Sequence, residues 1–232
     1  MIPLRDENPT ERTPIVTILI MIACTLVYFF EMSLPEPQLN AFLTAYGVVP
    51  ARYFAAGAAG SSSFFPLISY MFLHGGFLHY AGNMLYLWIF GNNVEDRLGH
   101  VGFLIFYTIC GIAAALIQSV ATATSTAPLI GASGAIAGVL AAYLVLFPNA
   151  RIVSLVFFFF FITTVALPAS VVILLWFLLQ LASSFETLAG ASTGVAYLAH
   201  VGGFVVGLVL VFLFPKKRKP PRVLPPDYFA GL

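Results

Sequence analysis

Residues 131–147 read GASGAIAGVLAAYLVLF, and residues 197–214 read YLAHVGGFVVGLVLVFLF; neither run contains a charged side chain. Both runs repeat a glycine after four positions: Gly134 and Gly138 in the first, Gly203 and Gly207 in the second. Small residues at this spacing let two helices approach closely in lipid, where apolar side chains give helices no drive to associate. We therefore expect the two runs to be membrane helices that pack against each other along their glycines.

The composition of the whole chain agrees with a membrane protein. Of its 232 residues, 60% are hydrophobic and only 8% are charged, and the mean hydropathy is +0.98. A soluble globular protein carries about 25% charged residues. These values exclude a disordered chain, a nucleic-acid-binding protein with a basic face and an ordinary cytosolic enzyme.

The apolar runs predict an all-α, polytopic membrane protein with six transmembrane helices. A bilayer core of about 30 Å needs about 20 apolar residues per helix, and the runs are divided where charges, proline and glycine cluster. The predicted spans are 14–32, 78–94, 101–121, 131–147, 168–183 and 197–214. Together they form one membrane domain over residues 14–214.

Two further segments are apolar without matching a simple span. Residues 152–182 are too long for one perpendicular helix, so we expect a break at Pro168, with 152–167 as a hydrophobic extension along the membrane interface or dipping into it. Residues 33–70 are interrupted by proline, glycine and serine, and we expect a folded external loop that rests on the membrane surface.

The positive charges predict the orientation. Nine of the ten Lys and Arg residues fall on the side of the two termini, and only Arg52 falls on the other side. Since basic residues favour the cytoplasmic side, residues 1–13 form a cytoplasmic N-terminal segment, and residues 215–232 form a basic, proline-rich cytoplasmic tail. Without charges inside the spans or a repeated polar lining, a pump, exchanger, voltage sensor or transporter is disfavoured.

The polar residues within the spans point to acyl transfer. His79, Asn83, Ser133 and His200 all lie near the external ends of their helices, hence at a similar depth. A histidine beside a serine can take the hydroxyl proton and return it to a leaving amine. Because Ser133 begins a helix, its backbone N–H is free to bind an oxyanion, and His79 and Asn83 can add side-chain donors.

In these and neighbouring residues the chain resembles the rhomboid intramembrane serine proteases. The matching segments are His74–His79 with Asn83 and Gly91, then Val94–Gly99, then Gly131–Gly134, then Ala199–Gly203 with Gly207. The resemblance covers residues 14–214 and implies a six-helix rhomboid bundle.

The resemblance also implies the roles of individual residues. Ser133 is then the nucleophile and His200 the general base and acid, without cofactor or metal. His79, Asn83 and the Ser133 backbone N–H form the oxyanion hole. The implied partners are the lipid bilayer and single-span membrane proteins, cut in or near the external end of their helix, with no nucleic acid. The implied location is a bacterial inner membrane, with the active site opening to the external side.

The sequence departs from relatives at two places. Many relatives have a Trp-Arg pair in the first external loop, where this chain has Phe65-Pro66. Some bacterial relatives stack an aromatic residue on the catalytic imidazole four positions after the serine, where this chain has Ala137. The orientation of His200 must then come from elsewhere, such as helix packing.

Less specific interpretations stay open beside the protease. A non-catalytic rhomboid-like protein that binds transmembrane helices would keep the glycine packing. A zinc site from His74, His79 and His200 is the least favoured alternative, because the chain lacks His-Glu-x-x-His and a carboxylate at that depth.

Five other residues have structural interpretations. We expect His74 to be hydrogen-bonded to the external loop, and Glu95 and Arg97 to brace helix ends. Cys24 and Cys110 read as small core residues. The sequence does not predict the oligomeric state.

Overall fold

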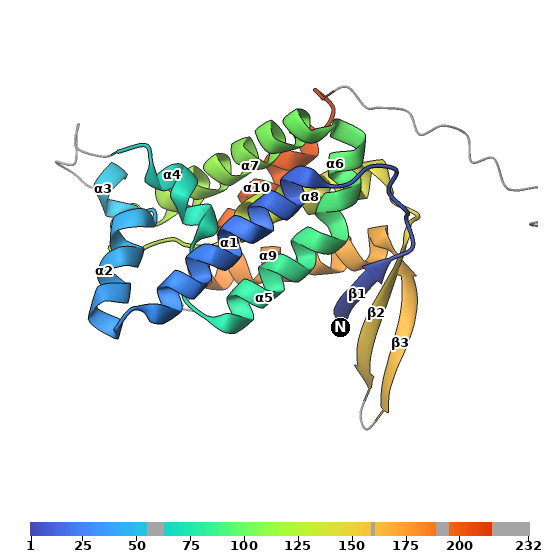
Figure 1. Cartoon of the computed structure of the whole chain (residues 1–232), viewed down its shortest axis with the longest axis horizontal. Helices are drawn as coiled ribbons and strands as arrows, with labels where there is room; N and C mark the ends of the chain where they lie inside the picture. The colour runs from blue at the N-terminus through green and yellow to red at the C-terminus, as the bar shows by residue number, and fades with distance from the viewer. Residues whose placement is uncertain (55–62, 159–160, 189–194, 215–232) are drawn as a thin grey trace, which may run out of the picture.

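The computed structural model is a bundle of helices with a small sheet at one end (Figure 1). It describes residues 1–54, 63–158, 161–188 and 195–214, so the predicted tail 215–232 lies outside the described residues. Each predicted span contains a helical segment: α1 (Ile15–Ser33), α5 (Phe77–Tyr86) with η2 (Leu87–Gly91) and α6 (Asn92–Leu98), α7 (His100–Ala121), α8 (Ser133–Leu146), α9 (Ala169–Leu188) and α10 (Tyr197–Leu210). Within the second of these, α5, η2 and α6 follow one another without a break from 77 to 98, and η2 is a π-helical turn.

Two of these helices, α1 and α7, are long and apolar enough to cross a membrane by length and composition. Helices α8 and α10 and the Ala169–Phe185 part of α9 are apolar but shorter. Many of the side chains on α1, α7 and α9 that face outward are leucine, isoleucine, valine or phenylalanine. A surface of this kind is suited to lipid contact.

Helix α8 is the centre of the bundle. Ten consecutive residues, Gly134–Tyr143, are buried, because α7, α10 and the α5–η2 segment surround the helix. A methyl group added at Gly203 would meet the carbonyl oxygen of Gly134, and one at Gly207 would lie 2.5 Å from Cα of Gly138. The backbones of α8 and α10 are therefore in contact along their glycines.

A three-stranded antiparallel sheet corrects the all-α prediction. Strands β1 (Ile2–Asp6), β2 (Arg151–Phe158) and β3 (Phe161–Pro168) lie in the order β1-β2-β3. Ile152 pairs with Leu167 in β3 and with Asp6 in β1. The segment 152–167 is thus a β-hairpin, which is consistent with its many β-branched and aromatic residues. The predicted break at Pro168 is confirmed, since β3 ends there and α9 begins at Ala169.

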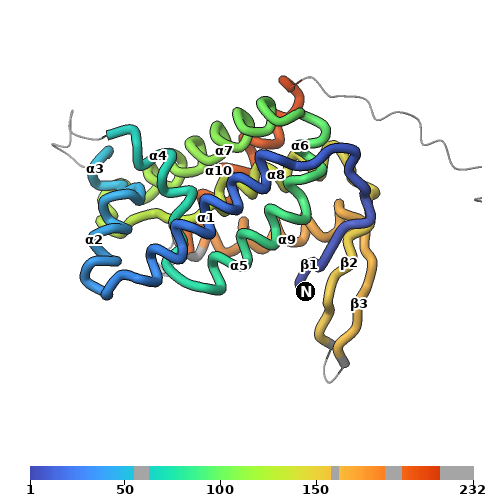
Figure 2. Tube along the Cα trace, in the orientation of Figure 1, coloured from blue at the N-terminus to red at the C-terminus, as the bar shows by residue number. Residues whose placement is uncertain are grey.

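The N-terminal segment is part of the fold through this sheet. Figure 2 shows that β1 lies beside β2 and that the chain then runs across the end of the bundle to the start of α1. At the end of β1, the Asp6 carboxylate accepts hydrogen bonds from the Tyr143 hydroxyl and the Asn93 side-chain amide, both at 2.7 Å. These two bonds fasten the sheet to α8 and α6.

The predicted external loop contains short helices: α2 (Glu36–Tyr46), α3 (Ala51–Phe54), α4 (Pro66–Ser69) and the 3-10 turn η1 (Tyr70–Phe72). It lies at the end of the bundle away from the sheet (Figure 1). Residues 55–62 of this loop are outside the described part of the chain.

A buried carboxylate, Glu95, joins three helix ends. Its oxygens accept the backbone N–H of Val16 at 2.8 Å and of Thr17 at 2.7 Å, and the Thr17 hydroxyl at 2.7 Å. The His100 imidazole lies 2.6 Å from the same carboxylate. The expectation that Glu95 braces helix ends is confirmed, because it satisfies N-terminal amides of α1 that have no partner within that helix.

Candidate active site

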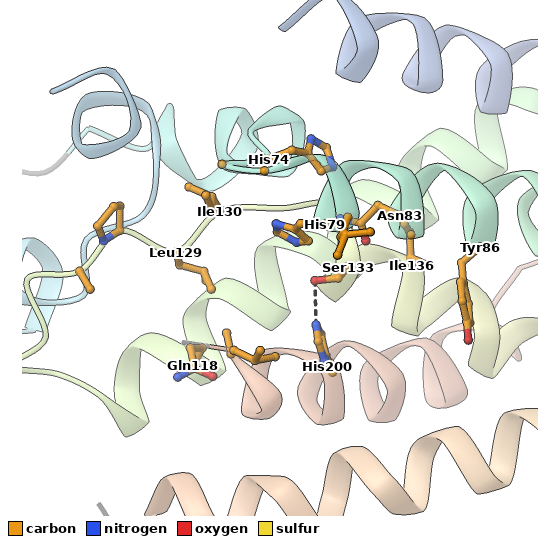
Figure 3. Close-up of a pocket in the computed structure, with 18 of the residues that line it drawn as sticks. His74, His79, Asn83, Tyr86, Gln118, Leu129, Ile130, Ser133, Ile136 and His200 are labelled. Carbon is orange, nitrogen blue, oxygen red and sulfur yellow. Dashed lines mark hydrogen bonds between the residues drawn. The ribbon is translucent and has the colours of Figure 1, made fainter. Parts of the chain in front are cut away.

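The hydroxyl of Ser133 and the imidazole of His200 are in direct contact although they lie 67 positions apart (Figure 3). The Ser133 Oγ to His200 Nε2 distance is 2.7 Å. A hydroxyl held at this distance from an imidazole can pass its proton to the ring as it attacks a carbonyl carbon. The pair is partly buried, so solvent does not compete freely for either group.

The backbone ahead of Ser133 determines where this hydroxyl points. Gly131 has a φ of 113°, a conformation that L side chains rarely adopt, and α8 begins two residues later. The Gly131 amide donates to the Tyr70 carbonyl at 2.8 Å, which ties this turn to η1. Ser133 consequently stands at the first position of α8.

His200 lies in the first turn of α10, and the start of that helix is held by α7. The Gln118 side-chain oxygen accepts the Ala199 amide at 3.1 Å. Because Gly203 has no side chain, the backbones of α10 and α8 are in contact there, and the His200 imidazole reaches Ser133 directly.

His79 and Asn83 lie on one face of α5, on the other side of Ser133 from His200 (Figure 3). A methyl group at Gly131 would lie 2.6 Å from the His79 ring and 3.6 Å from Asn83 Nδ2. Among the described residues, Asn83 Nδ2 is a buried donor with no hydrogen-bond partner. A buried N–H without a partner is costly, and a substrate oxygen placed beside Ser133 could accept from it.

These four residues line one cavity of about 850 Å³. Its wall also includes Ala127, Pro128, Leu129 and Ile130, so the non-helical stretch before α8 lines the cavity. Trp176 of α9 and Tyr86 of α5 border it as well. The volume is within the range of about 300–1,000 Å³ that small-molecule sites occupy.

A role for Gln180 was not predicted from the sequence. Its side-chain oxygen lies 2.7 Å from Nδ1 of His200, the ring nitrogen that does not face Ser133. One signal was present: Gln180 is an amide within a stretch that has no charged residue from 152 to 185. Nothing in that stretch indicates which way the side chain faces.

Glu31 was missed too, and it supports the loop beside the site. Its carboxylate accepts the His74 backbone N–H at 3.0 and 3.2 Å, just ahead of α5. The ring centroids of His74 and His79 are 5.4 Å apart. The Nδ1 atom of His74 lies 3.1 Å from the Phe72 carbonyl oxygen. The His74 side chain therefore bonds to the backbone two positions after the predicted loop 33–70, and not to the loop itself.

Three other expectations concern the surroundings of the site. Arg97 does not bond a helix end in the contacts described; its guanidinium lies 5.6 Å from the Phe147 ring centroid. Cys24 and Cys110 are free and buried, as predicted. Within residues 1–54, 63–158, 161–188 and 195–214, no group of three or more His, Cys, Asp or Glu side chains could hold a metal ion.

Comparison with known proteins assigns this chain to a family. The model of the rhomboid domain matches residues 61–217, which include all four site residues. This chain belongs to the rhomboid family. The family assignment made from the motifs alone is thereby confirmed.

Curated relatives of this rhomboid come from fungi, plants and animals. Rhomboid protein 1, mitochondrial, of Saccharomyces cerevisiae is 32% identical over 160 residues, 67% of this chain and 43% of the relative. RHOMBOID-like protein 5 of Arabidopsis thaliana is 30% identical over 167 residues, 70% of this chain and 49% of the relative. The presenilin-associated rhomboid-like protein, mitochondrial, of Bos taurus is 32% identical over 103 residues, which are 44% of this chain and 27% of the relative. This rhomboid thus spans less than half the length of each of these relatives.

Proposed function

We propose that this rhomboid is an intramembrane serine endopeptidase in which Ser133 is the nucleophile and His200 the general base and acid. The main support is the 2.7 Å contact between Ser133 Oγ and His200 Nε2 inside a cavity large enough for part of a peptide. Family membership supports the fold that carries this pair.

The reaction follows the usual course of acyl transfer. Ser133 Oγ bonds to the scissile carbonyl carbon while its proton moves to His200 Nε2. The carbonyl oxygen becomes an oxyanion, for which the Ser133 backbone N–H, Asn83 and His79 are the proposed donors. When the C–N bond breaks, the proton passes from Nε2 to the leaving nitrogen, and water then cleaves the acyl-enzyme by the same route.

The proposed topology has six spans with both termini on one side of the membrane. Helix α3, which contains Arg52, lies at the opposite end of the bundle from α6 and the sheet, which contain Arg97, Arg5 and Arg151 (Figure 1). This distribution agrees with basic residues on the cytoplasmic side. The cavity then opens on the external side, and the first loop lies at that surface.

The sequence predicted a bacterial inner membrane, but the proposal does not name the cellular membrane. Two of the three relatives named above are mitochondrial by name, so the comparisons lend no support to a bacterial inner membrane. The proposal concerns a protein of the bilayer, with the cavity on the side away from the sheet.

The proposed substrates are transmembrane helices of other proteins. Backbone N–H and C=O groups within a helix are bonded to one another, so a segment must unwind before its carbonyl reaches Ser133. A short α8, which begins at Ser133, places the nucleophile below the membrane surface, where the end of such a helix would lie.

A fluorophosphonate probe and a reporter with one transmembrane helix test this proposal. The purified protein in detergent should bind the probe covalently and cleave the reporter, whereas Ser133→Ala should do neither. Ser33→Ala, which alters an exposed serine at the end of α1, is the matched control and should behave as the native protein does.

Because the two groups act as a unit, His200→Ala and the double variant should lose as much cleavage as Ser133→Ala. Labelling of Ser133→Ala equal to that of the native protein, or an intact reporter with the native protein, would contradict catalysis. The second result together with reporter binding would favour the alternative, a non-catalytic rhomboid that binds transmembrane helices.

A further inference from the structure

The His200 imidazole is bonded at both of its nitrogens, by side chains from two different helices. Nε2 lies 2.7 Å from Ser133 Oγ of α8, and Nδ1 lies 2.7 Å from Gln180 Oε1 of α9. We propose that Gln180 is a positioning residue that fixes the tautomer and the orientation of His200. This inference rests on the proposed function, because it assigns a role within the same reaction.

The hydrogen-bond chemistry of an amide determines which nitrogen carries the proton. A side-chain carbonyl oxygen can only accept, so Nδ1 must be the N–H of the neutral ring. The lone pair is then on Nε2, the nitrogen that faces Ser133 Oγ. With the other tautomer, Nε2–H would face the hydroxyl and could not take its proton.

The bond to Gln180 persists through the proposed cycle. When Ser133 Oγ bonds to the carbonyl carbon, Nε2 gains the hydroxyl proton, and the imidazolium still donates Nδ1–H to Gln180 Oε1. When the C–N bond breaks, Nε2 gives its proton to the leaving nitrogen and the ring returns to the starting tautomer. Gln180 gains and loses no proton, so it acts only through His200.

The surroundings of Gln180 argue that this bond has a specific purpose. A polar amide within an apolar helix is unfavourable unless it is hydrogen-bonded. Leu178 and Leu179 beside it are each 58% exposed and face outward, whereas Gln180 is turned toward α10. The amide therefore faces the one ring in α10 that takes part in the reaction.

A second residue of α9 contacts the same ring. Trp176 lies four positions before Gln180, so the two share a face of the helix. The Trp176 and His200 ring centroids are 5.9 Å apart at 39°. Ala137, one turn after Ser133, is too small to orient the imidazole, and α9 supplies the contacts that helix packing alone was expected to provide.

Cleavage kinetics and the tautomer of His200 together test this role. Gln180→Leu removes the acceptor with little change in size. We expect kcat to fall about 10- to 100-fold, the loss typical when the hydrogen-bond partner of a metal-bound histidine is removed, with KM unchanged. Gln180→Glu keeps an acceptor oxygen and should restore most of kcat. Leu179→Ala, at the adjacent lipid-facing position, is the matched control and should leave kcat unchanged.

The tautomer is measured by NMR of the protein labelled with ¹⁵N-histidine. The chain has four histidines, and the signal that is missing from the His200→Ala spectrum belongs to His200. In the native protein Nδ1 should be protonated and Nε2 unprotonated, and Gln180→Leu should shift His200 toward the Nε2–H form. A purely structural role for Gln180 would leave this spectrum unchanged. Should Gln180→Leu lose its thermal transition, Gln180→Met, also without an acceptor, takes its place with the same expected shift.

The outcomes separate this inference from the proposed function. If the native protein cleaves the reporter and Gln180→Leu has the native kcat and tautomer, the positioning role is wrong. If the native protein neither cleaves nor binds the fluorophosphonate probe, the proposed function is wrong, but the NMR comparison still decides whether Gln180 fixes the tautomer.

Discussion

The carboxylate of Glu31, at the end of α1, accepts the backbone N–H of His74, which lies 43 positions later in the turn before α5. Both residues are buried, with exposed fractions of 2% and 0%. The bond joins the C-terminal end of α1 to the segment just before α5, the helix that contains His79. The partner of the Glu31 carboxylate in this contact is a backbone N–H donor.

Replacing Glu31 by glutamine should destabilise the protein. A hydrogen bond to a charged acceptor contributes about 1.5–3 kcal/mol, and the amide of Glu31→Gln offers only one acceptor atom and adds donors that need partners. We expect a lower thermal transition in detergent. Glu36→Gln, which alters an exposed carboxylate in α2, is the matched control; an equal loss in both variants would contradict the importance of the bond.

His74 predicts a dependence of stability on pH. Burial, together with the nearby His79, lowers the pKa of His74 from 6.5 to about 4. Between these values the unfolded chain binds a proton that the folded chain does not. The contribution of His74 is therefore fully present above pH 6.5 and is lost as the pH falls toward 4, by up to about 3 kcal/mol.

Thermal transitions of the native protein and of His74→Gln at pH 7.5, 6 and 5 test this dependence. The glutamine side chain at position 74 carries no charge at any of these pH values. The thermal transition of the variant should therefore fall less between pH 7.5 and 5 than that of the native protein. Equal decreases would show that other groups cause the loss.

Packing between α8 and α10 predicts a large effect of one methyl group. Gly203→Ala would place a carbon against the Gly134 carbonyl oxygen, and overpacking of this kind costs about 1–3 kcal/mol or more. Since a shift of α10 also moves His200 away from Ser133, both the thermal transition and kcat should fall. Gly102→Ala, where the nearest atom to the added carbon is 3.5 Å away, should change neither.

The proposed oxyanion donors predict a loss of rate without a loss of binding. Removing one such donor typically lowers kcat by about 10²–10³. Asn83→Ala and His79→Ala should each show this loss in reporter cleavage, with a KM close to the native value. A native kcat in Asn83→Ala would contradict its role, which is inferred from a buried Nδ2 donor that has no hydrogen-bond partner among the described residues and lies at the cavity.

Much of the helical core could be predicted from the sequence, because lipid imposes a simple requirement on it. Backbone groups in a bilayer must be satisfied internally, so apolar runs become helices. The spacing of Gly134, Gly138, Gly203 and Gly207 also predicts which helices meet, since only these helices carry the repeat. The proximity of Ser133 and His200 follows from that contact.

Gln180 could not be placed in the same way. Helix α9 is apolar all round, so its sequence does not indicate which face turns inward, and the contact with His200 depends on that rotation. The hairpin 151–168 was missed for a related reason. A continuous apolar run has no period by which a strand could be told from a helix.

The hairpin itself predicts a contact with lipid at the end of the bundle remote from the cavity. Phe157 and Ile162 are cross-strand partners, with exposed fractions of 55% and 67%. A sheet face bathed by water would carry polar residues there. We therefore expect these two side chains to lie in the membrane interface, as the sequence analysis proposed for this segment.

Spin labels can measure this placement in vesicles. Ile162→Cys, with the buried Cys24 and Cys110 replaced by alanine, should give a label that is more accessible to oxygen than to a water-soluble nickel chelate. A label at Arg12→Cys, on the exposed segment before α1, should show the reverse. If the label at 162 is as accessible to nickel as the label at 12, the hairpin projects into water, and its apolar face must be covered by something other than lipid.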